Sequence, residues 1–150
     1  MPRVGQILEI EQRDLGGKID TFYCIRLVTN GLKVMIPTSN KEGLRGLAND
    51  QVVKEVFTLL ADHNIHVDNS TWNRRYREYM TKIKTGSLME IADVLRALFL
   101  LKASKNLSFG ERKMLDQCKE LIVKEIAISS GNREDQISSE IDSCFIARNE

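Results

Sequence analysis

The hydrophobic pattern of this chain changes once, near residue 46, and divides the sequence into two parts with different secondary structure. Before this point, runs rich in β-branched and aromatic residues predict strands at about residues 4–11, 22–28 and 32–36. After it, apolar residues recur every three or four positions, which is typical of amphipathic helices. We therefore expect an α+β protein with a small antiparallel β module at residues 1–46 and a helical domain at residues 47–150.

Glycine-containing pairs mark the turns of the β module. Gly16-Gly17 predicts a turn after the first strand, and Asn30-Gly31 predicts a two-residue hairpin in which both turn residues have positive φ. Pro37 ends the third strand. Because three short strands enclose only a thin core, we expect the module to be marginally stable by itself.

Five amphipathic helices are expected in the second part. Two of them open with a capping box, at residues 87–90 (Ser-Leu-Met-Glu) and 108–111 (Ser-Phe-Gly-Glu), where the serine and the glutamate satisfy each other's backbone N–H groups. Asn49 is suited to cap the first helix, and Gly131 suits the C-terminal end of the fourth. The last helix is expected at about residues 133–147. Short links and one apolar stripe per helix predict a compact bundle.

Charge is distributed unevenly along the chain, although the formal net charge is only +1. Residues 72–119 hold 11 Lys and Arg against 5 Asp and Glu, whereas the remaining residues hold 11 against 16. One basic segment in a nearly neutral protein favours contact with a polyanion at that segment over contact along the whole protein surface. The alternative is a solvated basic helix face without a ligand.

The cysteines and the hydropathy indicate the compartment. Cys24, Cys118 and Cys144 are widely spaced and lack a Cys-x-x-Cys pair, so they fit neither a disulfide framework nor a zinc site. We expect small buried residues in a reducing compartment. No apolar run reaches membrane-spanning length, and the N-terminus lacks a signal-peptide core. These features predict a soluble, cytoplasmic protein without membrane contact.

Patterns that indicate an enzyme are weak. The chain has no Gly-x-Gly-x-x-Gly motif, no P-loop and no nucleophile with an obvious base. His63 and His66, flanked by Asp62 and Asp68, could hold a metal ion, but a polar loop predicts that they are exposed to solvent. We therefore expect no catalytic residues, no metal and no cofactor.

The segment from Trp72 to Met80 combines aromatic and basic side chains. On a helix, Trp72 and Tyr76 share one face, whereas Arg74 and Arg77 lie on another, with Arg75 near its border. Trp72 could be the first core residue of the helix. Alternatively it overhangs the edge of the core as an apolar plate surrounded by cations, suited to a minor-groove base step or to a protein partner.

Two further segments offer contacts. Arg112 and Lys113 lie one turn into the fourth helix, where they could add phosphate contacts or form an ordinary surface pair. Residues 33–37 alternate in polarity, so one face of this strand could point outward. Met35 is then either an adaptable protein contact or a core residue.

Several of these segments together resemble the CarD/CdnL family of bacterial transcription regulators. The resemblance runs from about Val4 to Phe145, with the motifs in family order. The Trp-x-Arg-Arg and Leu-Ser-x-Gly-Glu-Arg-x-Met-Leu motifs are the most specific. The segments that carry it are Val34-Met35-Ile36-Pro37, Gly43-Leu44-Arg45, Thr71-Trp72-Asn73-Arg74-Arg75-Tyr76-Arg77, Lys84-Thr85-Gly86 and Leu107-Ser108-Phe109-Gly110-Glu111-Arg112-Lys113-Met114-Leu115.

The resemblance implies a Tudor-like N-terminal domain that binds the β subunit of RNA polymerase and a helical domain that contacts promoter DNA at the upstream edge of the melted bubble. It implies a nucleoid-associated regulator that stabilises the open complex without catalysis and with weak sequence preference. The implied minor-groove wedge is Trp72. The expected DNA contacts are Trp72, Arg74, Arg75, Arg77, Arg112 and Lys113, and the expected polymerase contacts are Arg13, Val34, Met35, Ile36 and Pro37. The alternative is a protein-interaction adaptor whose Trp72/Arg surface binds an acidic partner without DNA.

One departure from the family pattern concerns the start of the chain. Family members begin with a strand of the type Phe-x-x-Gly-Asp-x-Val-Val-Tyr-Pro before a His-Gly turn, whereas this chain begins near the end of that turn, at Val4-Gly5-Gln6-Ile7. A module without that strand exposes a sheet edge. We expect it to be less ordered than the helices, or to pair through this edge with a second copy or another chain.

Overall fold

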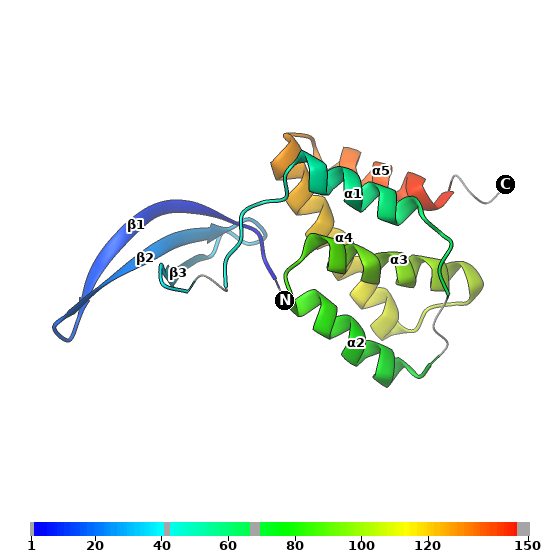
Figure 1. Cartoon of the computed structure of the whole chain (residues 1–150), viewed down its shortest axis with the longest axis horizontal. Helices are drawn as coiled ribbons and strands as arrows, with labels where there is room; N and C mark the ends of the chain where they lie inside the picture. The colour runs from blue at the N-terminus through cyan, green and yellow to red at the C-terminus, as the bar shows by residue number, and fades with distance from the viewer. Residues whose placement is uncertain (1, 41–42, 67–69, 147–150) are drawn as a thin grey trace. The chain divides into compact units, whose positions relative to one another are not determined.

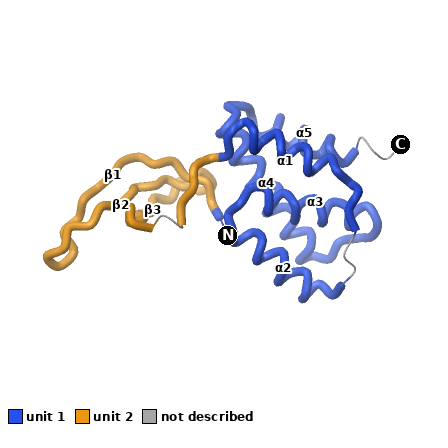
Figure 2. The backbone as a smooth tube through the Cα atoms, in the orientation of Figure 1, with its two compact units in different colours: residues 1–2, 48–150 blue, residues 3–47 orange. Residues whose placement is uncertain are grey.

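The computed structural model describes residues 2–40, 43–66 and 70–146. A three-stranded antiparallel sheet precedes five helices in these residues, which confirms the predicted α+β class (Figure 1). The chain divides into two compact units, one of residues 3–47 and one of residues 1–2 and 48–150 (Figure 2). No helix in the described ranges is long and apolar enough to cross a membrane.

The sheet of the first unit has the strand order β1-β2-β3, with β1 at Gly5–Leu15, β2 at Lys18–Leu27 and β3 at Lys33–Pro37. The first two strands are longer than predicted, because Gly16 and Gly17 have φ values of 66° and 91° and close a two-residue hairpin directly between Leu15 and Lys18. Positive φ at both positions is the conformation that a type I′ turn needs and that glycine adopts without a steric penalty.

The turn between β2 and β3 differs from the prediction. Gly31 has a φ of 71°, but no described non-glycine residue has a positive φ, so Asn30 does not form the predicted two-residue hairpin. Instead, the Asn30 side-chain oxygen accepts a hydrogen bond from the N–H of Leu32 at 3.0 Å. The backbone N–H of Leu27 donates to the carbonyl of Leu32, which closes a four-residue loop over residues 28–31. This hydrogen bond between the Asn30 side chain and the backbone of Leu32 takes the place of a turn with positive φ at Asn30.

The register gives the sheet two different faces. Ile7 and Ile10 lie on one face, because a β-bulge between Ile7 and Glu9 shifts the alternation by one residue. They remain 54% and 63% exposed. Ile25 and Leu27 are the buried hydrophobic residues of this unit within its described ranges. The core of the module is therefore thin, and β1 forms an edge of its sheet.

The helical unit consists of α1 (Asp50–Ala61), α2 (Trp72–Lys84), α3 (Leu88–Ser104), α4 (Phe109–Ser130) and α5 (Glu134–Ile146). The predicted caps form: Asn49 accepts from the N–H of Val52, and Gly131 ends α4 with a φ of 74°. Ser108 and Glu111 form both bonds of a capping box. Ser87 accepts from the N–H of Glu90, the serine half of the other predicted box. The predicted end of the last helix at residue 147 lies outside the described residues.

The helical unit has a continuous apolar core. α3 contacts α1, α2 and α4, and α5 packs against α1 and α4. Each buried leucine or isoleucine contributes about 1.5–3 kcal/mol relative to an exposed one. The largest fully buried apolar side chains of the helical unit include Val56, Leu60, Ile83, Val94, Leu95, Leu98, Ile122, Ile126, Ile137 and Ile141. This core holds α2 and the start of α4 in fixed positions.

Candidate nucleic-acid interface

Trp72 is the first residue of α2, and its indole lies half-buried at the edge of the helical core. The ring lies against Gly110 in the first turn of α4, where a Cβ atom would be 3.0 Å from Nε1 of Trp72. It also meets the ring of Tyr76 edge-on, with centroids 5.7 Å apart and planes at 70°. Trp72 is thus both packed on the core and partly open to solvent, so the two sequence interpretations each describe part of its environment.

Arg75 lies on the inner side of α2, contrary to the expectation that it contacts DNA. Its side chain is buried, with a residue exposure of 3%. Nη1 donates to Oε2 of Glu111 at 3.1 Å, and Nε donates to the carbonyl of Ser70 at 3.0 Å. The guanidinium also lies 5.2 Å from the centroid of the Trp72 ring. Because the charge is enclosed and already paired, we remove Arg75 from the predicted DNA contacts.

Glu111 connects this arginine to the start of α4. Its Oε1 accepts from the N–H of Ser108 at 3.1 Å, while its own N–H donates to Oγ of Ser108. Lys105 Nζ lies 3.6 Å from Oε1. Burial alone raises the pKa of Glu111, but the hydrogen bonds from Ser108 and the bond and charge of Arg75 outweigh it and hold that pKa below its ordinary value. The carboxylate therefore stays ionised and ties α2 to α4 beneath Trp72.

Four predicted cations are exposed on the two helices that meet at Trp72. Arg74 and Arg77 are exposed on α2, and Arg112 and Lys113 are exposed on α4. Arg74 approaches Glu78 at 3.8 Å, but both side chains are largely in solvent, where such a pair contributes little. We call Trp72 and these four cations the α2/α4 rim.

Two exposed aromatic residues lie beside this rim, and neither was among the predicted contacts. Tyr76 is 46% exposed on α2, and Phe109, the first residue of α4, is 75% exposed. From the sequence, Phe109 was assigned only to a capping box and to a motif of the family resemblance. The helical period could have identified it, since Phe109 is three residues from Arg112 and four from Lys113, and the buried stripe of α4 begins on the other side.

The predicted polymerase contacts divide between the two faces of the sheet. Met35 pairs with Cys24, which pairs with Glu9, and Arg13 shares this face through the two-residue alternation of β1. Val34 and Ile36 pair with residues on the opposite face and are half-buried. Pro37 is exposed on the Met35 face. The structure therefore does not bring all five predicted residues onto one surface.

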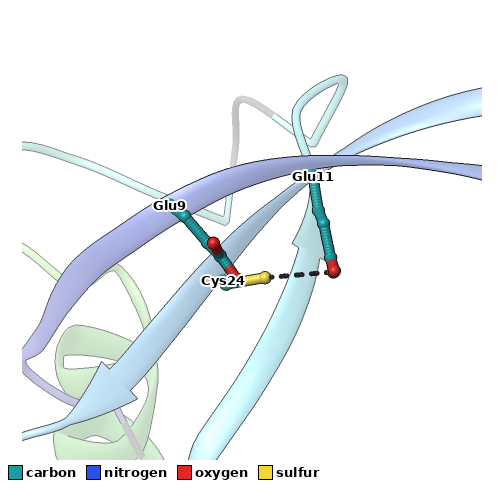
Figure 3. A group of neighbouring side chains, drawn as sticks. All are labelled: Glu9, Glu11 and Cys24. Atoms are coloured by element: carbon teal, nitrogen blue, oxygen red, sulfur yellow. Dashed lines mark hydrogen bonds between the residues drawn. The ribbon is translucent and has the colours of Figure 1, made fainter.

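Cys24 lies in a cluster with Glu9 and Glu11 on this same face (Figure 3). The thiol donates to Oε2 of Glu11 at 3.5 Å, and Nη2 of Arg13 lies 3.3 Å from the same oxygen. Partial desolvation, the bond to Glu11 and the charges of both carboxylates raise the pKa of the Cys24 thiol. Cys24 is therefore a half-buried, protonated thiol among charges, rather than the buried core residue that was expected.

The two histidines have different surroundings. His63 is half-buried and stacks on Phe145, with ring centroids 5.4 Å apart, and Phe145 stacks in turn on Phe99. The predicted solvent-exposed position is therefore wrong for His63, whereas His66 is exposed. Asp68 lies outside the described residues. Where the structure describes the chain, neither histidine belongs to a group of ligands close enough to share a metal ion.

Comparison with known proteins supports the sequence resemblance. The family model for the CarD C-terminal domain matches residues 55–142, which include all of α2, α3 and α4. A Bacillus subtilis (strain 168) protein named "Putative transcription factor YdeB" is 32% identical over 141 residues, which cover 93% of this chain and 92% of that protein. The fold and these matches define a transcription factor built from a β module and a helical unit. The chain belongs to the CarD family.

Proposed function

We propose that this transcription factor binds RNA polymerase through its β module and promoter DNA through the α2/α4 rim, and that it thereby stabilises the open promoter complex. The observation that carries the proposal is the position of Trp72, a half-buried aromatic side chain at the edge of the helical core, where two helices that each carry exposed cations meet. Membership of the CarD family supports a role in transcription, and the rim supplies the chemistry for a DNA contact.

The four rim cations are suited to the phosphate backbone. Arginine and lysine side chains release condensed counterions when they neutralise phosphates, and this contact does not depend on sequence. Three or four such contacts predict a slope of about −3 to −4 for log affinity against log salt concentration. We therefore expect weak, salt-sensitive DNA binding with little sequence preference.

Trp72 is suited to act as a wedge because its ring is fixed on three sides. Gly110 lets the indole approach the α4 backbone, Tyr76 meets it edge-on, and Arg75 lies under it. An apolar side chain that enters a base step must offset an unstacking cost of about a few kcal/mol. At the edge of a melted bubble that cost is already met, so the wedge acts on the open complex more than on intact duplex.

The β module supports the polymerase contact through one face and one edge. Arg13 and Met35 share the face that also carries Cys24, and we retain these two, with Pro37, as the proposed contact residues. β1 lies at a sheet edge, whose backbone groups can pair with a strand from a partner or a second copy. Pull-down of the polymerase β subunit tests the first partner, and sedimentation of the purified protein tests the second.

An adaptor function remains as a second candidate because exposed Tyr76 lies one residue before exposed Arg77, a combination that also favours protein contacts. A photo-reactive amino acid at position 76 separates the two functions. In a complex of polymerase, promoter and this protein, DNA-binding predicts a crosslink to DNA near the upstream edge of the bubble. A crosslink only to protein, in a complex that retains the polymerase contact, would favour the adaptor.

A further inference from the structure

Phe109 is the most exposed large hydrophobic residue in the described part of the chain, at 75%. It begins α4, directly before the Gly110 on which the Trp72 indole lies. Folding of the helical unit gains almost nothing from a phenylalanine in water, because burial is what makes such a ring stabilising. Its position beside the rim therefore suits a role in binding.

The helical period places Phe109 on a charged stripe. Residues three and four positions apart on a helix lie on the same face, so Phe109 shares a face with Arg112 and Lys113. Both cations are exposed, whereas Met114 and Leu115 are buried on the other side of the helix. The stripe therefore combines one open ring with two cations at the positively polarised end of a helix.

The ring of Phe109 is open on its own face. Among the described residues, Trp72 makes ring contacts with Tyr76 and Tyr79, and none of the ring pairs includes Phe109. Glu111 is buried and bonded to Arg75, so it does not place a negative charge beside Phe109. The exposed carboxylate on this face is Asp116, which lies two turns from Phe109, beyond both cations. A flat, apolar ligand surface that carries negative charges beside it fits one open ring with two neighbouring cations.

We propose that Phe109 is a second base-contacting side chain of this protein, and that with Trp72 it makes the helical unit prefer DNA with unpaired bases over intact duplex. The inference rests on the proposed DNA contact of the α2/α4 rim. Unpaired bases offer flat faces for stacking on aromatic rings, while arginine and lysine track the backbone between them. Paired bases in a closed duplex cover those faces, so the ring adds little to duplex binding.

The test compares two DNAs of equal length, one fully paired duplex and one forked duplex with unpaired ends, by fluorescence anisotropy at one low salt concentration. The full chain is used as wild type, Phe109→Ala, Phe109→Tyr and Trp72→Ala. Ile128→Ala is the matched control, because Ile128 is a 45% exposed apolar residue of the same helix outside the rim. Circular dichroism confirms that each variant is folded.

Phe109→Ala is expected to weaken binding to the fork about tenfold and to change duplex binding less than about twofold, since alanine substitution of a base-stacking ring has effects of this order. Phe109→Tyr should retain the fork preference, and Ile128→Ala should match wild type. Wild-type fork binding by Phe109→Ala would overturn the inference, as would an equal loss on both DNAs. Trp72→Ala separates the two proposals. If Trp72→Ala weakens binding to the fork and Phe109→Ala does not, only the role of Phe109 is contradicted. If the wild type binds neither DNA, both proposals are contradicted.

Discussion

The two units of this protein differ in how completely they bury their apolar side chains. The helical unit encloses most of its leucines and isoleucines in one core to which all five helices contribute, with Ile128 and Ile146 among the exceptions. The β module buries Ile25 and Leu27 and leaves Ile7, Ile10 and Ile19 largely exposed in its described ranges. The helical unit can therefore hold a site rigidly without help. The β module gains more from a partner, because a partner could cover the apolar surface that its own strands leave open.

The same contrast occurs within α2 at the scale of single residues. Arg75 is enclosed and bound to Glu111, while Arg74 and Arg77 on the same helix are exposed. A buried cation fixes the position of its neighbours, and exposed cations remain available to a ligand. The Arg-Arg pair of the Trp-x-Arg-Arg motif thus combines one exposed cation with one buried cation that lies against Trp72.

The largest expected effect follows the loss of this buried cation. Arg75→Met removes the buried cation bound to the Glu111 carboxylate and leaves it only Ser108 and the half-exposed Lys105, so we expect the free energy of unfolding to fall by about 3 kcal/mol. Trp72 is the single tryptophan of the chain, and its emission should shift to the red as the ring loosens. Urea unfolding followed by tryptophan fluorescence measures both effects.

Arg77→Met is the matched control for this variant, because Arg77 lies on the same helix in solvent. Its free energy of unfolding should stay within about 0.5 kcal/mol of wild type. Equal stabilities for Arg75→Met and Arg77→Met would contradict the internal role of Arg75.

A smaller difference is expected between matched apolar truncations in the two units. Leu98→Ala creates a cavity in the helical core and should lower the free energy of unfolding by about 2–4 kcal/mol. Ile10→Ala removes a side chain that is mostly in solvent and should change it by less than about 0.5 kcal/mol. Urea unfolding by circular dichroism compares the two. A larger loss for Ile10→Ala would show that the β module contributes more stability than its burial indicates.

Acid should weaken the helical unit through two carboxylates. Asp93 on α3 accepts hydrogen bonds from Lys82 and Arg96, as Glu111 does from Ser108 and Arg75. Burial opposes ionisation at both sites, but these bonds and charges hold the pKa of Glu111 and that of Asp93 below their ordinary values of 4.5 and 3.8. Folding therefore favours the ionised forms, and their contribution is present above these ordinary values and is lost as the pH falls through the lower folded values. Urea unfolding at neutral and acidic pH should show a smaller pH-dependent loss for Glu111→Gln than for wild type. An identical loss in both proteins would contradict the assignment to Glu111.

The smallest expected effects concern single exposed cations. Arg74→Ala and Arg112→Ala should each leave stability unchanged and reduce the slope of log DNA affinity against log salt by about 1. Lys54→Ala, an exposed lysine on α1, is the control and should leave the slope as in wild type. Anisotropy titrations at several salt concentrations measure these slopes, and an unchanged slope for both arginine variants would exclude them as phosphate contacts.

Much of the fold could be predicted because its signals are local. Gly16-Gly17 requires only backbone freedom, and Asn49 and Ser108 need only the N–H groups of the next turn, so these features follow from neighbouring residues. Asn30-Gly31 was predicted wrongly because asparagine has two local options. It can adopt positive φ, or its side chain can bind the backbone, as it does with Leu32.

The candidate site was less predictable because it depends on contacts between distant residues. The aromatic and basic character of the Trp72 segment was visible, but the burial of Arg75 depends on Glu111, 36 residues later in the chain. Strand alternation places Val34 and Met35 on opposite faces of the sheet, whereas the family motif had grouped them as contacts of one partner. Phe109 was overlooked because it lies between the two residues of a capping box, a motif that accounts for its neighbours and does not indicate that its own ring is exposed.

The lifetime of the open promoter complex tests the central claim, that Trp72 at the α2/α4 rim acts on melted DNA. Complexes of polymerase and promoter are formed with wild type, Trp72→Ala or the Ile128→Ala control, challenged with a competitor, and followed until they dissociate. We predict a several-fold shorter lifetime with Trp72→Ala, although its affinity for intact duplex changes little, and an unchanged lifetime with Ile128→Ala. Equal lifetimes for wild type and a folded Trp72→Ala variant that still binds polymerase would contradict the account.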